Sequence, residues 1–141
     1  MIKKIIDAVS VSINAEFGDE YEIYTENLEQ GLTEPCFSIL CLNPTIEQFR
    51  GNKYYRTNQF CIQYFPSSTE KNAECFDVQE RLMDCLEYIT VGTDLTRGTK
   101  MNGQVVSGVL NFFVNYDMFV YKVAVEADPM ETMTVDSDVK G

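Results

Sequence analysis

Alternating apolar and polar positions predict a strand near the middle of the chain. The segment Tyr54–Phe65 places Phe60, Ile62 and Tyr64 on one side of an extended backbone. Pro66 follows directly and cannot continue a strand interior, because its ring removes the backbone N–H. The sequence therefore predicts a strand with one apolar face that ends at this proline.

The apolar spacing then changes from two residues to about 3.6, which predicts an amphipathic helix from Glu70. The hydroxyls of residues 67–69 are expected to cap its free amides. One helical stripe carries the apolar side chains, namely Cys75, Val78, Leu82, Cys85, Leu86 and Ile89. A sheet face and a helix face thus arise next to each other, and each needs apolar cover.

A second amphipathic helix is predicted at the start of the chain and is expected to end at Gly18. Its apolar positions recur at helical spacing: Ile2, Ile5, Ile6, Val9, Ile13 and Phe17. The opposite face carries few lysines or arginines, which disfavours a helix that lies on a membrane surface. Tyr21–Thr25 alternates and predicts a short strand.

A long hairpin is predicted from Cys36–Phe49 against Lys53–Phe65, with the turn at Gly51-Asn52. Its outer half should project from the core. The tip holds three of the few bases in the chain: Arg50, Lys53 and Arg56. They are either scattered charges on a solvated loop or a contact to an acidic neighbour, for example another copy of this chain.

A second hairpin is predicted from Arg97–Val106 with Val109–Val120, and Asn111–Val125 is the most strand-like stretch of the sequence. Arg97 and Lys100 form a second basic loop near its start. From Glu126 the chain becomes acidic. We therefore expect one domain over residues 1–125 and a flexible acidic C-terminal arm over 126–141, or an arm that orders against a partner.

The formal net charge is −11, from 22 acidic and 11 basic residues. This balance argues against a groove that binds nucleic acid, because such a groove needs clustered Lys and Arg side chains to replace counterions. It fits a self-repelling surface, or a surface that faces DNA without binding it or mimics it. No apolar run is long enough to span a membrane, and the N-terminus does not look like a signal peptide.

The chain has no histidine and five cysteines, none of them in a C-x-x-C pair. The lack of histidine removes the usual partner of a catalytic cysteine or serine and the commonest metal ligand. The cysteines have apolar neighbours, so we interpret them as small buried hydrophobic residues in a reducing compartment. No metal site is expected.

Motifs for nucleotide, phosphate or zinc chemistry are missing from the sequence. Ser67-Ser68 with Lys71 is explained by a turn and a helix cap. Tyr54-Tyr55 beside Arg56 could stack on bases, but one patch on so acidic a chain is weak support. Asp77 and Arg81 look like an ordinary solvated helix face. We expect neither enzymatic activity nor a cofactor.

Several segments, taken in order and spacing, resemble a family of small tail terminators from siphophage- and myophage-like elements of Gram-positive bacteria. The resemblance covers almost the whole chain. The matching segments are Glu16-Phe17-Gly18, Ile23-Tyr24-Thr25-Glu26-Asn27, Glu29-Gln30-Gly31-Leu32, Glu34-Pro35-Cys36-Phe37, Tyr64-Phe65-Pro66, Leu86-Glu87-Tyr88-Ile89, Arg97-Gly98-Thr99-Lys100, Phe112-Phe113-Val114-Asn115-Tyr116 and Asp128-Pro129-Met130-Glu131.

This resemblance implies an α+β fold, with one mixed or antiparallel sheet of about four to six strands and two amphipathic helices packed on it. It also implies a homo-oligomeric ring, commonly a hexamer, that caps the finished tail tube and stops its polymerisation. Such a ring docks the head connector, and DNA passes through its lumen without specific binding. Assembly would take place in the host cytoplasm, and the product would lie at the head-proximal end of the virion tail.

From charge and expected exposure, we select five bases as candidate contacts between copies: Arg50, Lys53, Arg56, Arg97 and Lys100. In a ring, one copy's basic hairpin tip would meet the acid-rich surface of the next. Two alternatives stay open. One is a head–tail joining or completion protein of related fold, and the other is an acidic DNA-mimic inhibitor.

Overall fold

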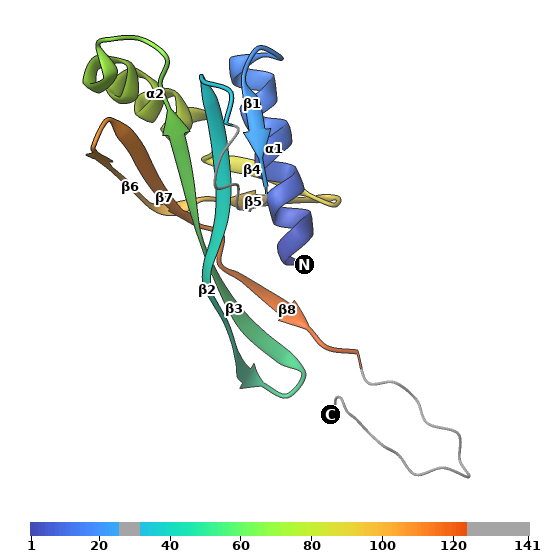
Figure 1. Ribbon diagram of the computed structural model, residues 1–141. Helices are drawn as coiled ribbons and strands as arrows, with labels where there is room; N and C mark the ends of the chain where they lie inside the picture. Colours follow the sequence, from blue (N-terminus) through green and yellow to red (C-terminus); the bar gives the residue numbers. More distant parts are fainter. Residues whose placement is uncertain (26–31, 124–141) are drawn as a thin grey trace.

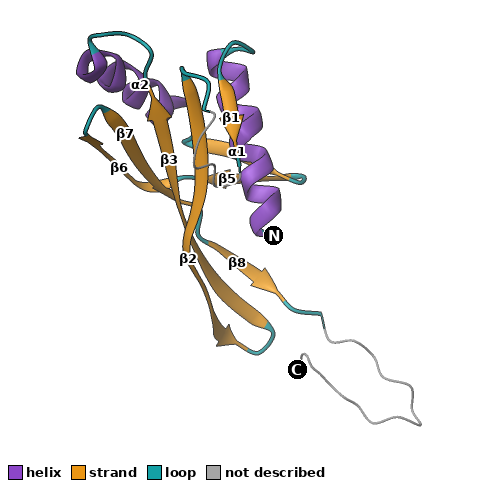
Figure 2. Ribbon diagram, viewed as in Figure 1, coloured by secondary structure: helices purple, strands orange, loops and turns teal. Residues whose placement is uncertain are grey.

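The computed structural model describes residues 1–25 and 32–123, which form a six-stranded sheet, a separate two-stranded sheet and two helices. The helices are α1 (Ile2–Phe17) and α2 (Lys71–Cys85). The strands are β1 (Glu22–Tyr24), β2 (Cys36–Arg50), β3 (Lys53–Phe65), β4 (Tyr88–Val91), β5 (Asp94–Arg97), β6 (Thr99–Val106), β7 (Val109–Asn115) and β8 (Met118–Tyr121). The predicted α+β fold class is confirmed (Figures 1 and 2).

The main sheet has the strand order β1-β2-β3-β7-β6, and β8 also pairs with β3. β1 runs parallel to β2, and the other pairs are antiparallel. β3 is the central strand, because β2 lies along one edge while β7 and then β8 lie along the other. β4 and β5 form a separate two-stranded hairpin.

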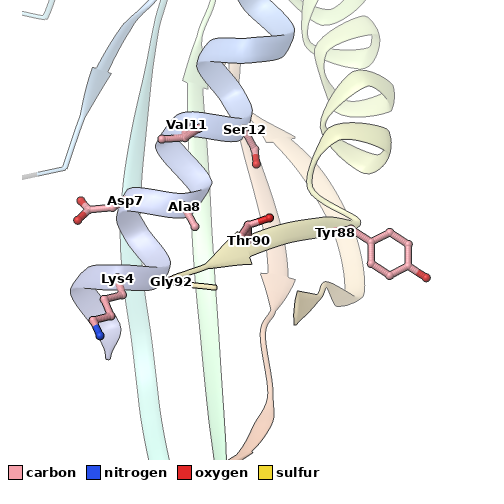
Figure 3. Close-up of a pocket in the computed structure, with 8 residues that line it drawn as sticks. All are labelled: Lys4, Asp7, Ala8, Val11, Ser12, Tyr88, Thr90 and Gly92. Carbon is pink, nitrogen blue, oxygen red and sulfur yellow. The ribbon is translucent and has the colours of Figure 1, made fainter. Parts of the chain in front are cut away.

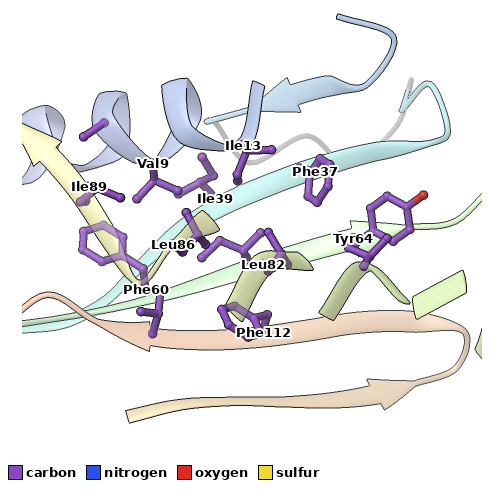
Figure 4. Close-up of a cluster of buried hydrophobic side chains, with 14 of the residues drawn as sticks. Val9, Ile13, Phe37, Ile39, Phe60, Tyr64, Leu82, Leu86, Ile89 and Phe112 are labelled. Atoms are coloured by element: carbon purple, nitrogen blue, oxygen red, sulfur yellow. The ribbon is translucent and has the colours of Figure 1, made fainter. Parts of the chain in front are cut away.

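The core lies between one face of this sheet and the two helices, with β4 beside them (Figure 4). The sheet contributes alternate residues of its three central strands: Phe37, Ile39, Phe60, Ile62, Tyr64, Leu110, Phe112 and Val114. The helices contribute the stripes that their spacing predicts, including Ile5, Val9, Ile13, Phe17, Cys75, Val78 and Leu82. Burying each large apolar side chain contributes roughly 1.5–3 kcal/mol before entropy is counted.

The second helix ends at Cys85, so its predicted extension to Ile89 is wrong. The carbonyls of Leu86 and Glu87 instead accept hydrogen bonds from distant parts of the chain. The Tyr116 hydroxyl donates to the Leu86 carbonyl at 2.6 Å, and the Gly98 amide donates to the Glu87 carbonyl at 2.7 Å. Ile89 is still buried, but it enters the core from β4.

The predicted capping of α2 by the hydroxyls of residues 67–69 is also wrong, since no side chain caps its N-terminus. The carboxylate of Glu74 instead reaches back from the first turn. It accepts hydrogen bonds from the backbone amides of Ser67 and Ser68, at 3.3 and 3.1 Å, and from the Tyr64 hydroxyl. One side chain therefore joins the end of β3 to the start of α2.

The predicted strand Val109–Val120 is interrupted after Asn115, although β7 and β8 keep one register along β3. The Asn58 amide donates to the Asp117 carboxylate at 3.0 Å instead of continuing the ladder. The side-chain amide of Asn58 donates a hydrogen bond to the Tyr116 carbonyl at 2.9 Å. β6 begins only at Thr99, because Arg97 belongs to β5 and pairs with Tyr88.

Arg81 makes contacts outside its own helix, whereas its spacing with Asp77 predicts only a solvated helix face. Its guanidinium lies 4.1 Å from the centroid of the Phe17 ring and donates to the Glu16 carboxylate at 2.9 Å. It also donates to the Glu16 carbonyl at 3.0 Å. Arg81 therefore connects the two helices.

The five cysteines are free, and Cys36, Cys61 and Cys75 are buried as the sequence predicts, whereas Cys41 and Cys85 are only half-buried. In residues 1–25 and 32–123, no helix is long and apolar enough to cross a membrane. The predicted acidic arm over residues 126–141 lies outside the described residues.

Candidate subunit-contact surface

The outer part of the sheet projects beyond the helices as a three-stranded extension (Figure 1). We define this sheet extension as residues 45–57 and 118–123. Every residue of β2 from Asn43 to Arg50 is exposed, whereas the inner end of the same strand is buried. The predicted long hairpin with a projecting outer half is therefore present, and β8 widens it by one strand.

One face of the sheet extension carries four aromatic rings around a lysine. We call Phe49, Lys53, Tyr55, Phe119 and Tyr121 the aromatic–lysine cluster. The cross-strand register places Lys53 opposite Tyr121 and Tyr55 opposite Phe119. The ring centroids of Phe119 and Tyr55 are 4.9 Å apart, and those of Phe119 and Phe49 are 5.2 Å apart.

The ammonium group of Lys53 lies over these rings. Its nitrogen is 4.4 Å from the Phe119 centroid, 5.4 Å from Phe49 and 6.0 Å from Tyr121. A cation over aromatic faces is stabilised by the ring quadrupoles. The rings nevertheless remain accessible, with Phe49 59% exposed and Tyr121 64% exposed. Exposed aromatic residues beside a base are typical of contact surfaces.

The three predicted bases at the hairpin tip do not share one face. Arg50 is exposed and lies opposite Lys53. Arg56 has the opposite parity on β3 and lies between Ile46 and Met118 on the other side of the sheet. Its Nε is buried and has no hydrogen-bond partner in the described part of the chain. Arg50 and Lys53 are thus the two tip bases associated with the aromatic face.

Arg97 and Lys100 lie on a different part of the surface. With Met83 and Glu87 they line a shallow groove, where the Arg97 guanidinium is 3.8 Å from the Glu87 carboxylate. The neighbouring Thr99 pairs with Asn115 on β7, and Asn115 pairs with Gln59 on β3, so Thr99 and Gln59 lie at the same height along the sheet. At about 3.3 Å per residue, this level is about 20 Å from Lys53 along β3. The five predicted basic residues therefore lie at three places: Arg50 and Lys53 on the aromatic face, Arg56 on the other side of the sheet, and Arg97 with Lys100 at the groove.

A third hollow lies between α1 and β4, with a volume of about 400 Å³ (Figure 3). Its lining residues are Lys4, Asp7, Ala8, Val11, Ser12, Tyr88, Thr90 and Gly92. The Asp7 carboxylate in this lining is paired with Lys3 on the same helix, at 3.2 Å. In the part of the chain that the structure describes, no three His, Cys, Asp or Glu side chains come together as metal ligands.

The cysteine thiols are poor nucleophiles in this fold. Burial, together with the nearby charge of Glu16, raises the pKa of Cys85 to about 12. Burial raises the pKa of Cys36 to about 11, with added effects from Glu34 and Glu22. Since the thiolate is the reactive form, these groups stay protonated and unreactive near neutral pH.

Sequence reasoning missed Phe49, Phe119 and Tyr121, and it considered Tyr55 only as a residue that could stack on nucleic-acid bases. The signal was present, because Phe119 and Tyr121 share a parity on the last predicted strand. What the sequence did not show was that this strand pairs with Lys53 and Tyr55, more than 60 residues earlier. Side chains alternate between the two faces of a strand, so Lys53 and Arg56, three positions apart, lie on opposite faces of the sheet.

Comparison with known proteins gives a family and a structural relative. Residues 4–128 match the family model described as phage tail terminator protein. Among curated proteins, no match is found. A solved structure, the sheath/tube terminator in the extended state of PVC, an extracellular contractile injection system, is similar with a TM-score of 0.50 and 13% sequence identity. The alignment covers 99% of this chain and 65% of that one, so the chain spans about two thirds of its length.

Proposed function

The chain belongs to the phage tail terminator family, and from this premise we propose that its copies assemble as a ring on the end of a tail tube and stop further tube growth. The family is one of structural proteins and not an enzyme class. The observation that carries the proposal is the family match over residues 4–128, which includes almost every described residue.

The sheet extension supports self-association. Its four bases, Arg50, Lys53, Arg56 and Lys122, outnumber its single acid, Glu47, while the whole chain has a net charge of −11. A ring needs a heterologous contact, in which one patch meets a different patch on the next copy. A basic, aromatic projection on an acidic molecule is suited to such a contact.

The remaining roles follow from the position of a ring at the end of a tube. We propose that one face of the ring contacts the tail tube and the other docks the head connector, with DNA passing through the lumen. An acidic lumen would repel the phosphate backbone and let DNA move without binding. The ring would be assembled in the host cytoplasm and remain at the head-proximal end of the virion tail.

The molar mass in solution tests the proposal directly. Light scattering should show a discrete oligomer, either from the protein alone or only after purified tail tubes are added. Tube length should stop increasing once the protein has bound. A chain that remains monomeric and ignores the tubes would contradict the proposal and favour an acidic inhibitor of a DNA-binding protein.

Charge reversal at the hairpin tip tests the contact itself. The double variant Arg50→Glu with Lys53→Glu should abolish assembly, because it places carboxylates where an acidic neighbour would bind. The matched control is Lys3→Glu with Lys4→Glu on α1, which makes the same change in net charge on exposed residues. Normal assembly of the tip variant in the light-scattering measurement would remove Arg50 and Lys53 from the interface.

Arg97→Glu with Lys100→Glu tests the second basic site in the same assay. Loss of assembly in this variant alone would place the interface at the groove beside Met83 and Glu87. Loss in both variants would indicate that each copy uses two basic surfaces.

A further inference from the structure

We propose that residues 124–141 of one copy bind the aromatic–lysine cluster of a neighbouring copy. The inference rests on the proposed function, because it requires copies that assemble side by side. The segment would cover the cluster, and every copy in the ring would both donate a segment to one neighbour and receive one from the other.

The charges of the two partners are complementary. Residues 124–141 contain five acids and one base, which gives a net charge of −4. The acids are Glu126, Asp128, Glu131, Asp136 and Asp138. The sheet extension has four bases and one acid, so its net charge is +3. The remaining residues, 1–44 and 58–117, have 16 acids and 6 bases, so their net charge of −10 would on balance repel the segment.

The apolar side chains are complementary as well. Met130, Met133 and Val135 are spaced between the acids of the segment. The cluster presents rings that are 36% to 64% exposed. Thioether groups make favourable contacts with aromatic rings, and a flexible methionine adapts to an irregular surface. The rings would bind these residues, while Lys53 and Arg50 would face the neighbouring carboxylates.

The chain leaves the described structure at a suitable place. β8 ends at Tyr121, opposite Lys53, and the Lys122 amide donates to the Asn52 carbonyl at 2.9 Å. The described chain therefore ends near the tip of the sheet extension, and β8 points away from the helices (Figure 1).

The available length is enough to reach a second molecule. Ten extended residues span about 35 Å, which is comparable with the diameter of a domain of this size. Met133 lies ten residues after Val123, the last described residue. A neighbour whose cluster lies one domain width away would therefore be within reach of the apolar anchors.

Photochemical crosslinking in the full chain tests this inference. A benzophenone amino acid replaces Met133, and copies with normal isotopes are mixed with ¹⁵N-labelled copies, with and without tail tubes. We expect crosslinks between labelled and unlabelled copies that map to residues 45–57 or 118–123. Crosslinks confined to a single copy, or crosslinks that avoid these residues, would overturn the inference.

Two surface variants show whether the cluster is responsible. Phe119→Ser should lower the yield of crosslinks between copies roughly tenfold, the size of effect expected for an exposed aromatic anchor. Phe76→Ser is the matched control, because Phe76 is similarly exposed on α2. Equal yields in the two variants would contradict the assignment.

Tube-length measurements on the same samples separate this inference from the proposed function. Tubes that are capped normally, with no crosslink to the cluster, would leave the terminator role intact and reject only the segment contact. Crosslinked copies that do not cap tubes would reject the role while retaining the contact.

Discussion

Glu74 shows how one side chain can hold the turn that precedes a helix. Its carboxylate accepts hydrogen bonds from the backbone amides of Ser67 and Ser68 and from the hydroxyl of Tyr64, so it satisfies donors of the turn between β3 and α2. Burial alone would raise the pKa of Glu74, but the hydrogen bonds from Ser68, Tyr64 and Ser67 outweigh it and lower the pKa. Burial and the same contact with Glu74 raise the pKa of Tyr64.

We expect Glu74→Gln to lower the free energy of unfolding by about 1–2 kcal/mol, because hydrogen bonds to an ionised group are stronger than those to a neutral amide. Urea denaturation followed by circular dichroism measures this loss. Glu80→Gln, on the exposed face of the same helix, is the control and should change stability by less than about 0.5 kcal/mol.

The Glu74 contribution should also depend on pH. The folded pKa is lowered from the ordinary value of 4.5, so the folded state favours the charged carboxylate. The stabilisation is therefore complete above pH 4.5 and is lost as the pH falls through this value and then through the lower folded pKa. The difference in stability between the native chain and Glu74→Gln should shrink on acidification. A constant difference from pH 7 to pH 3 would contradict this assignment.

At the scale of elements, Asn58 lies where the strand that pairs with β3 is interrupted between β7 and β8. Asn58 is fully buried, and its side-chain amide holds the Tyr116 carbonyl that the regular ladder would otherwise bind. The backbone amide of Asn58 donates a hydrogen bond to the Asp117 carboxylate instead. The register survives this exchange, so β8 continues onto the sheet extension and carries Phe119 and Tyr121 to the cluster.

Asn58→Ala should therefore lower the free energy of unfolding by about 1–3 kcal/mol, since it leaves the buried Tyr116 carbonyl without its donor. Gln59→Ala is the control, because Gln59 is adjacent and only half-buried. Chemical denaturation gives the comparison. If the two variants lose equal stability, the exchanged hydrogen bonds contribute little.

At the scale of the whole molecule, charge is distributed unevenly. The sheet extension carries a net charge of +3 on a chain whose total is −11. The remaining residues therefore sum to −14, so copies repel one another except where an extension meets an acidic surface. This asymmetry favours one orientation of approach and suppresses others.

We expect assembly to weaken several-fold when the salt concentration is raised from 0.1 to 1 M, because the Debye length falls from about 10 Å to about 3 Å. Sedimentation velocity at matched protein concentrations measures the oligomer fraction. Assembly that strengthens with salt would show that the aromatic contacts outweigh the charges.

The sequence alone determined which residues form the core faces and which form the long hairpin. Spacing of two residues identifies Phe60, Ile62 and Tyr64 as one side of a strand, and helical spacing identifies the buried side of α1. These inferences succeed because the side of an element on which a residue lies depends only on local backbone geometry. The bases Arg50 and Lys53 could be selected in the same way, from charge and position at a turn.

The tertiary structure decided the end of α2, the role of Glu74 and the position of β8. The helix does not reach Ile89, because Tyr88–Val91 pairs with β5, and the Leu86 carbonyl accepts a hydrogen bond from Tyr116, 30 residues later. The aromatic–lysine cluster exists because Phe119 is in register with Tyr55, and spacing within either strand carries no information about that register. Hydrogen-bond partners and strand registers join distant segments, so they are settled only when the whole chain has packed.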